Sequence, residues 1–413
     1  TPSAVRAAFA RVAAAAGPRV WSAGRAGPFL LALGAARAAL LQAWTAFFDA
    51  ARALASCPVP VVAAMAGHAP AGRQRALHQW ERRRVGKARS GTGPHAWYSG
   101  MLPGLLGGRY RAEQCRIPLQ ALCRAAGVEL IEESVVNLAA ANNTLLLGSG
   151  RRVSASWLSF NLGSQPLMPA IHGEQLQLLP VKPFAAFIES WDAWRHSPQP
   201  LAILGGGAAG VELALALAAQ VPTLALLSAG QILAGHPPAL RERALRHLAM
   251  AGVAVHEGIA IDRFKGDALL ANGQTIWRGQ RVILATGASP LPWLANAGLS
   301  CDAQGFIRIS ATLQSCSHPQ IFAVGDCASL PNTPHNGVYA VRQGPTLAAN
   351  LLAALNGLPL TDFVPQRRAL ALLADGQGGA LLSWSGITAE GRMFGWWKDR
   401  LDRRFIQQHM GQH

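Results

Sequence analysis

The sequence has no closely spaced pair of cysteines. Its six cysteines stand at positions 57, 115, 123, 301, 316 and 327, without a CxxC motif and without the spacing of a zinc site or a disulfide framework. An enzyme that works through a neighbouring dithiol, a zinc-stabilised fold and a disulfide-rich domain are therefore not expected. We predict a protein without a bound metal, in a reducing compartment such as the cytoplasm.

Long apolar runs are missing as well. Half of the 413 residues are hydrophobic and 14% are charged, so the chain has enough material for a large core and for two or three domains. Arg, Pro or Gly interrupts each apolar run before the roughly 18 residues that a membrane-spanning helix needs. We therefore expect no integral membrane segment, which leaves contact with a membrane surface open.

Acidic residues are scarce at the start of the chain. Residues 1–97 contain thirteen Lys or Arg but only Asp49 and Glu81 as acids, whereas residues 98–413 are nearly balanced. Most of the net charge of +16 is therefore local. A nucleic-acid partner for the whole protein is not expected, because its larger part has an ordinary charge balance.

The clearest motif is a glycine-rich turn between an apolar strand and an apolar helix. Residues 201–204 are apolar, Gly205, Gly207 and Gly210 follow with GxGxxG spacing, and residues 211–219 are rich in Ala and Leu. The first glycine allows a tight turn, the second lets the backbone approach a pyrophosphate, and the third lets the helix pack on the strand. The helix N-terminus then faces the phosphate charge. The pattern predicts a dinucleotide-binding α/β unit, with a purely structural turn as the alternative.

Two further strands belong to the same predicted unit. Residues 223–228 form the second strand, whose end should contact the adenosine ribose. NAD-binding units usually carry an acid there, but this chain has Ser228, so the choice between NADH and NADPH is open. Residues 281–285 form another strand, which ends in Thr286 and Gly287. We predict that Ser228 and Gly287 bind NAD(P)H together with the three glycines of the turn.

A later strand ends in a glycine and a carboxylate. Residues 321–324 are apolar and lead directly into Gly325 and Asp326. A carboxylate at the end of a buried strand is suited to accept hydrogen bonds from a sugar-like hydroxyl chain. The alternative for Asp326 is the N-cap of a helix that follows.

Together these motifs resemble the pyridine nucleotide-disulfide oxidoreductase superfamily, and within it the type II NADH dehydrogenase-like flavoproteins. The segments that carry the resemblance are GGGAAG at 205–210, ATG at 285–287, IFAVGDCA at 321–328 and GVYAVRQG at 337–344. YSGMLPG at 98–104 and WWKDRLDRRF at 396–405 resemble the flavoprotein domain that is often fused to selenophosphate synthetase. The resemblance covers about residues 95–410.

This resemblance implies an α/β fold with two Rossmann-like dinucleotide-binding domains, one for FAD and one for NAD(P)H. The FAD-binding domain would comprise 95–180 and 296–365, the NAD(P)H-binding domain 181–295, and a C-terminal segment 366–413. Hydride would pass from NAD(P)H to FAD and on to a small-molecule electron acceptor, quinone-like or selenium-related, without a dithiol.

The resemblance also names FAD-binding residues. Gly325 and Asp326 would bind the ribityl chain, and Gln343 would lie at a helix start beside the flavin. Gly163 would lie in a turn where the chain leaves the first half of the FAD-binding domain. Lys182 is a candidate neighbour of the flavin, with an exposed interdomain lysine as the alternative. No catalytic residue is assigned.

The predicted FAD half departs from the family pattern at its N-terminus. A strand that begins at Val61 is followed by Gly67 and Gly72, five residues apart, in place of a GxGxxG turn. Pro70 removes one of the backbone N–H donors that such a turn needs. We therefore expect the FAD half to be incomplete there. An inactive or remnant fusion protein with a broken FAD site is the alternative to an active enzyme.

Residues 1–72 resemble another family, the enoyl-CoA hydratase/isomerase (crotonase) family, in their SAG and GHAPAG segments. The resemblance implies a partial crotonase-like α/β segment, in which the backbone N–H groups of Arg25 and Gly72 would form an oxyanion hole for a thioester. A thioester-binding fragment is thus a further alternative. Residues 73–94 follow as a basic junction, interpreted as out-of-frame translation, a solvated linker or a nucleic-acid-binding arm.

Overall fold

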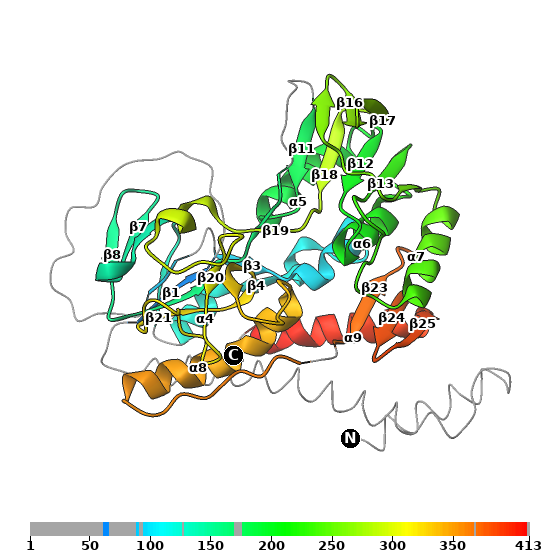
Figure 1. Cartoon of the computed structure of the whole chain (residues 1–413). Coiled ribbons are helices and arrows are strands. Elements are labelled where there is room, and N and C mark those ends of the chain that lie inside the picture. Colours follow the sequence, from blue (N-terminus) through cyan, green and yellow to red (C-terminus); the bar gives the residue numbers. More distant parts are fainter. Residues whose placement is uncertain are drawn as a thin grey trace, which may run out of the picture.

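Figure 1 shows the computed structural model of the chain, which describes residues 61–65, 88–90, 94–125, 128–168, 176–366 and 369–410. The predicted crotonase-like segment lies outside these residues apart from 61–65, and so does the predicted oxyanion hole at Arg25 and Gly72. Most of the predicted basic junction lies outside them as well.

The first parallel sheet joins strands from distant parts of the chain. All four of its pairings are parallel, with Val61 opposite Trp157 and Ile321 opposite Leu158. The central residues of the strands around Leu158 and Ile321 are buried, as expected for a parallel sheet that is covered on both faces. The strand order is β21 (Ile321–Ala323), β9 (Trp157–Asn161), β1 (Val61–Met65), β2 (Ala88–Ser90) and β5 (Glu129–Ile131).

The positions of β1 and β2 differ from the predicted division of the chain. That division assigned residues 61–65 to a crotonase-like segment and residues 88–90 to a junction, both outside the FAD-binding domain. In the structure β1 pairs with β9 on one side and with β2 on the other. Backbone pairing thus brings both strands into the sheet that ends in the predicted FAD-binding residues.

A long helix and an antiparallel sheet accompany this first sheet. Helix α8 (Gly337–Leu355) is capped by Asn336, whose side chain accepts the backbone N–H of Val338 at 3.1 Å. Leu347 and Leu351 of α8 join the core that contains the strand β21. The antiparallel strands are β6 (Val135–Ala139), β7 (Thr144–Leu147) and β8 (Arg152–Ser154).

The second parallel sheet contains the predicted dinucleotide-binding unit. Its order is β11 (Gln177–Pro180), β18 (Arg281–Leu284), β12 (Leu201–Leu204), β13 (Leu224–Leu227) and β14 (Ala254–His256). All four pairings are parallel, and β12, β13 and β18 are buried along their whole lengths. The predicted order of strand, glycine turn and helix is confirmed, because α6 (Ala208–Leu217) follows β12 directly. The other elements of this part are α5 (Phe184–Arg195), α7 (Pro238–Met250), β15 (Arg263–Lys265), β16 (Ala268–Ala271) and β17 (Gln274–Arg278).

The C-terminal part packs against a segment from near residue 100. Three antiparallel strands, β23 (Ala371–Ala374), β24 (Ala380–Trp384) and β25 (Ile387–Gly391), lead into α9 (Arg392–His409). Figure 1 shows α9 beside the cyan segment, which contains β3 (His95–Trp97), α3 (Leu102–Leu106), β4 (Arg116–Pro118) and α4 (Leu119–Ala125). This segment and the C-terminal helix thus form one packed region, with Ile406 in the same hydrophobic cluster as Met101 and Ile117.

Short elements complete the described residues. The two-residue strands are β10 (Gln165–Pro166), β19 (Ala288–Ser289), β20 (Ile307–Arg308) and β22 (Ala328–Ser329). The 3-10 helices are η1 (Ser99–Met101), η2 (Ala112–Cys115), η3 (Ala140–Asn142), η4 (Pro292–Asn296) and η5 (Gly325–Cys327). Within the described ranges, no helix combines the length and the apolar character needed to cross a membrane.

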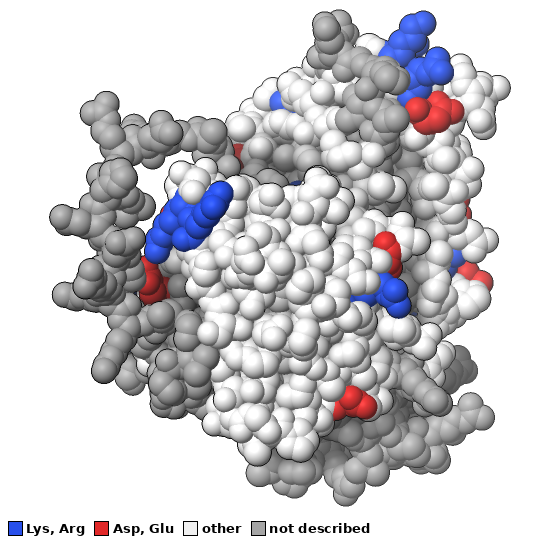
Figure 2. Space-filling view, turned by 60° about the vertical axis from the view of Figure 1, so that its left-hand side comes forward, with Lys and Arg blue, Asp and Glu red and all other residues white. Residues whose placement is uncertain are grey.

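Figure 2 shows the molecule turned so that the side with β7 and β8 comes forward. Among the described residues on this face, charged side chains are sparse.

Candidate functional site

A large cleft lies at the carboxyl ends of both parallel sheets. Its volume is about 1000 Å³. Residues at or after the ends of four strands line it: Asn161 at the end of β9 and Leu162 to Ser164 after it, Gly205 to Gly207 after β12, Ala285 to Gly287 after β18, and Asp326 after β21. Ligands of open α/β sheets bind at this edge. The cleft therefore brings together most residues that were predicted separately for FAD and for NAD(P)H.

The glycine turn after β12 has the geometry that its spacing predicts. Gly205 has a φ of +125°, and a Cβ there would collide with the carbonyl of Ala285. A Cβ at Gly210 would collide with the carbonyl of Gly205, so helix and strand approach as closely as they do because both residues are glycine. Gly207 is different, because a Cβ there would meet no atom within 4 Å. Its backbone faces open space in the cleft, where a pyrophosphate could approach it.

Asp326 and Lys182 form an ion pair on the wall of the cleft. Lys182 Nζ lies 2.6 Å from Asp326 Oδ2 and donates to Ser164 Oγ at 3.0 Å. The Ser164 hydroxyl also donates to Asp326 Oδ2 at 3.3 Å. The other carboxylate oxygen, Asp326 Oδ1, is buried without a hydrogen-bond partner. Lys182 is thus placed at the candidate site by its partners, and its side chain is only 29% exposed.

The N-cap alternative for Asp326 is not what the structure shows. Asp326 lies inside the short helix η5, which has no side-chain cap, and Asn336 caps the next long helix instead. Gly325 has a φ of +70°, and a Cβ there would lie 2.7 Å from Asn161 Oδ1. Gly163 also has a positive φ, of +69°, and lines the cleft.

Gln343 differs from its predicted position. Helix α8 begins at Gly337, so Gln343 lies in its second turn and not at its start. Its side chain is buried, with 2% exposure, and its Oε1 accepts the backbone N–H of Gly325 at 2.7 Å. Gln343 therefore holds the turn that carries Asp326 and is absent from the cleft lining.

Ser228 and Gly287 have different surroundings. Gly287 lines the cleft, and a Cβ there would meet no atom within 4 Å. Ser228 is buried, with 6% exposure, and its side chain packs against the Cα of Gly206. It is not among the residues that line the cleft, so the structure does not bring its hydroxyl into that space.

Glu212 is a cleft residue that the sequence analysis missed. It lies on α6, two residues after Gly210, and lines the cleft. Its Oε1 accepts the backbone N–H of Ala374 at 2.7 Å, and burial raises the pKa of its carboxyl. A single acid in a helix of Ala, Leu, Val and Gly is the signal that could have identified it.

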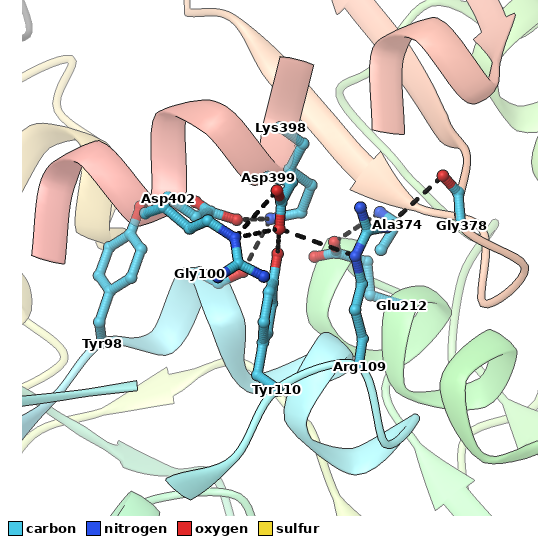
Figure 3. Close-up of polar contacts among 11 residues, drawn as sticks. Tyr98, Gly100, Arg109, Tyr110, Glu212, Ala374, Gly378, Lys398, Asp399 and Asp402 are labelled. Carbon is cyan, nitrogen blue, oxygen red and sulfur yellow. Dashed lines mark hydrogen bonds and ion pairs between the residues drawn. The ribbon is translucent and has the colours of Figure 1, made fainter. Parts of the chain in front are cut away.

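A cluster of charged residues links α9 to the segment around residue 100 (Figure 3). Lys398 Nζ of α9 donates to Asp402 Oδ2 at 3.0 Å and to the carbonyl of Gly100 at 2.7 Å. Tyr98 donates its hydroxyl proton to Asp402 Oδ1 at 3.0 Å. Burial raises the pKa of the Asp402 carboxyl. Burial alone would lower the pKa of Lys398, but the nearby carboxylates of Asp402 and Glu212 outweigh it, so the pKa of Lys398 is raised.

A second set of contacts lies beside it in the same view. Tyr110 donates its hydroxyl proton to Asp399 Oδ1 at 2.7 Å, and Arg403 Nε donates to both oxygens of Asp399 at 3.0 Å. Arg109 Nε lies 3.8 Å from the same carboxylate. The segment 98–110 is thus hydrogen-bonded to α9 at two neighbouring carboxylates, Asp402 and Asp399. No group of three or more His, Cys, Asp or Glu that could hold a metal is found among the described residues.

Comparisons with known proteins agree with this geometry. Residues 49–344 match the family model described as pyridine nucleotide-disulphide oxidoreductase. The match begins inside the predicted crotonase-like segment and includes the whole basic junction. The alternative NAD(P)H-ubiquinone oxidoreductase C1 of Arabidopsis thaliana is 26% identical over an alignment of 309 residues, which covers 65% of this chain and 58% of that protein. The demethylphylloquinone reductase NdbB of Synechocystis is 31% identical over an alignment of 213 residues, which covers 46% of this chain and 50% of that protein.

Solved structures show the same fold. The sulfide:quinone oxidoreductase of Aquifex aeolicus aligns with a TM-score of 0.68 and 16% identity, over 85% of this chain and 91% of that chain. The water-forming NADH oxidase of Lactobacillus brevis aligns with a TM-score of 0.63 and 18% identity, over 79% and 75% of the two chains. The chain spans about half the length of the two quinone-reducing relatives that it matches.

Proposed function

The chain belongs to the pyridine nucleotide-disulphide oxidoreductase family, and from this we propose that it is an FAD-dependent enzyme that oxidises NAD(P)H and reduces a small-molecule acceptor. Members of this family use FAD and NAD(P)H. The cleft supports the proposal because residues predicted to bind FAD and the glycine turn predicted to bind NAD(P)H line the same space. Hydride transfer between two cofactors needs such a shared space.

The unpartnered oxygen of Asp326 carries the FAD assignment. A buried acceptor without a donor costs about 1–3 kcal/mol, so a native structure seldom leaves one without a purpose. Asp326 is one of the residues that line the cleft, and the hydroxyl groups of a ribityl chain are donors of the right kind for its buried Oδ1. The other oxygen is already held by Lys182 and Ser164, so the carboxylate is fixed in place before a ligand binds. The residues present therefore fit the ribityl part of FAD.

The part of the cleft at the glycine turn after β12 fits a nicotinamide dinucleotide. The open backbone at Gly207 and the N-terminus of α6 provide N–H groups and a partial positive charge for a pyrophosphate. Gly287 leaves its side of the cleft free of side-chain atoms. Bound FAD would supply the hydride-accepting chemistry, and the chain would supply binding and orientation. Lys182, which is paired with Asp326, would hold in place the carboxylate that receives the ribityl hydroxyls.

We favour a quinone-like acceptor. None of the described residues along the cleft is a cysteine, so a relay of electrons through a dithiol has no support there. Leu102, Pro103, Val181 and Leu213 give the cleft apolar surface that suits a quinone ring. The names of the relatives from Arabidopsis and Synechocystis point the same way. A selenium-related acceptor and a cytoplasmic location stay predictions.

The test is to purify the whole chain and to identify bound flavin by its visible absorption and by chromatography after denaturation. NADH and NADPH oxidation would then be measured with a short-chain ubiquinone, with selenite and with glutathione disulfide. We expect bound FAD and the fastest turnover with the quinone. A colourless protein that does not take up added FAD would overturn the proposal and favour the remnant with a broken FAD site.

A further inference from the structure

The ribose end of the predicted NAD(P)H site lacks the acid that usually stands there. In a dinucleotide-binding unit, the adenosine ribose lies at the carboxyl end of the second strand. That strand is β13, and Ser228, which follows it, is buried against Gly206. The residues after it, Ala229 to Gln231, are exposed and uncharged. A group that distinguishes NADH from NADPH must therefore reach this place from another element.

Glu257 reaches it from the neighbouring strand. It follows β14 directly, and its Oε1 accepts the backbone N–H of Ile232 at 2.6 Å. Ile232 is fully buried and packs on the glycine turn, since a Cβ at Gly206 would lie 3.1 Å from its Cγ2. The next residue, Leu233, donates its backbone N–H to the carbonyl of Gly206 at 2.7 Å. Only Ile232 thus separates the carboxylate of Glu257 from the turn that would bind the pyrophosphate.

Arg241 of α7 forms an ion pair with the same carboxylate. Its Nε donates to Glu257 Oε1 at 3.2 Å, and its Nη2 forms an ion pair with Oε2. The two side chains stay accessible, with 27% and 23% exposure. The guanidinium of Arg241 lowers the pKa of Glu257, so the carboxylate is ionised at neutral pH. A cation suited to a phosphate is therefore present, but it is engaged by an acid.

We propose that Glu257 makes the site selective for NADH over NADPH by holding Arg241 in a two-point ion pair. A 2′-hydroxyl needs only a hydrogen-bond acceptor, which a carboxylate provides. A 2′-phosphate would meet the negative charge of Glu257 and would have to take Arg241 away from it. The inference rests on the proposed NAD(P)H site and names its coenzyme.

The test uses the whole chain and two probes that need no flavin, ADP and 2′,5′-ADP, with binding measured by calorimetry. We expect the natural chain to bind ADP more tightly. Glu257→Gln keeps an oxygen for the N–H of Ile232 but frees Arg241, so it should shift the ratio of the two affinities toward 2′,5′-ADP by about tenfold, the scale of one charge-assisted hydrogen bond. The ratio of kcat/KM for NADPH and NADH should move in the same direction.

Two further variants make the outcome specific. Arg241→Gln in the Glu257→Gln background should cancel the gain, because the freed cation is then gone. Glu242→Gln removes an acid from an exposed position on the same helix and should leave the ratio unchanged. Equal ratios for the natural chain and Glu257→Gln, or an equal shift in Glu242→Gln, would show that the inference is wrong. If neither probe binds the natural chain, the nucleotide site itself, and with it the proposed function, is refuted.

Discussion

The hydroxyl of Tyr98 donates a hydrogen bond to Asp402 Oδ1 at 3.0 Å, although 304 positions separate the two residues in the sequence. Asp402 also accepts a hydrogen bond from Lys398, whose ammonium group donates a second one to the carbonyl of Gly100. One carboxylate therefore fastens the C-terminal helix to the segment that enters the cleft at Gly100 and Leu102.

Asp402→Ala should destabilise the protein by about 3–5 kcal/mol, because it removes the carboxylate that is paired with the buried ammonium of Lys398. The side chains of Lys398 and Asp402 are only 14% and 6% exposed, so water cannot replace the lost carboxylate. The free energy of unfolding in urea measures the effect. Asp192→Ala is the control, since its pair with Arg195 is more than half exposed and should cost at most about 1 kcal/mol. Similar losses in the two variants would contradict the assignment of the cluster.

Asp326→Ala should weaken FAD retention by about 1.5–3 kcal/mol, the value of hydrogen bonds to a charged group. The variant removes the acceptor for the ribityl hydroxyls and also the partner of Lys182. Flavin content after gel filtration, relative to protein, measures the loss. Asp362→Ala changes an exposed aspartate and should keep its flavin. An Asp326→Ala protein with full flavin content would remove Asp326 from the site.

Thiol reagents should leave NADH oxidation intact. Burial raises the pKa of the Cys327 thiol to about 12, so at neutral pH this cysteine beside Asp326 is protonated and inaccessible. Cys316 is exposed and should react with iodoacetamide. Peptide mass spectrometry would locate the label, and activity would be assayed on the same sample. Labelling of native Cys327, with loss of activity, would point to a thiol step that the proposed function does not include.

The strands and turns of the second sheet could be predicted from the sequence for a physical reason. A strand that is buried on both faces is an uninterrupted apolar run, as in β12 and β13. The glycine directly after β12 shows where the backbone turns sharply. The same reasoning reached Asp326 after β21. It could not reach β2, because Ala88–Ser90 is three residues long and contains no apolar run. Its place in the sheet depends on pairing with strands that are distant in the sequence.

Residues that act through long-range contacts were also out of reach. The family resemblance implied that Gln343 lies at a helix start, but α8 begins at Gly337 and continues through Gly344 and Pro345. Its role became visible only with the contact to Gly325. The local pattern of α9 likewise does not show that Lys398 and Asp402 meet Tyr98.

Gly207→Val should abolish NAD(P)H binding and leave FAD in place. A Cβ at Gly207 meets no protein atom within 4 Å, so the larger side chain fits the fold and extends into the space that a pyrophosphate would occupy. The flavin wall at Asp326 lies after a different strand and should keep its ligand. Gly148→Val is the control, because this exposed glycine lies in the turn after β7, away from the cleft lining. Titration with NADH, followed by bleaching of the flavin absorption under anaerobic conditions, measures the result. If the flavin of Gly207→Val is fully bleached at the NADH concentration that bleaches the flavin of the natural chain, the turn does not bind the nucleotide.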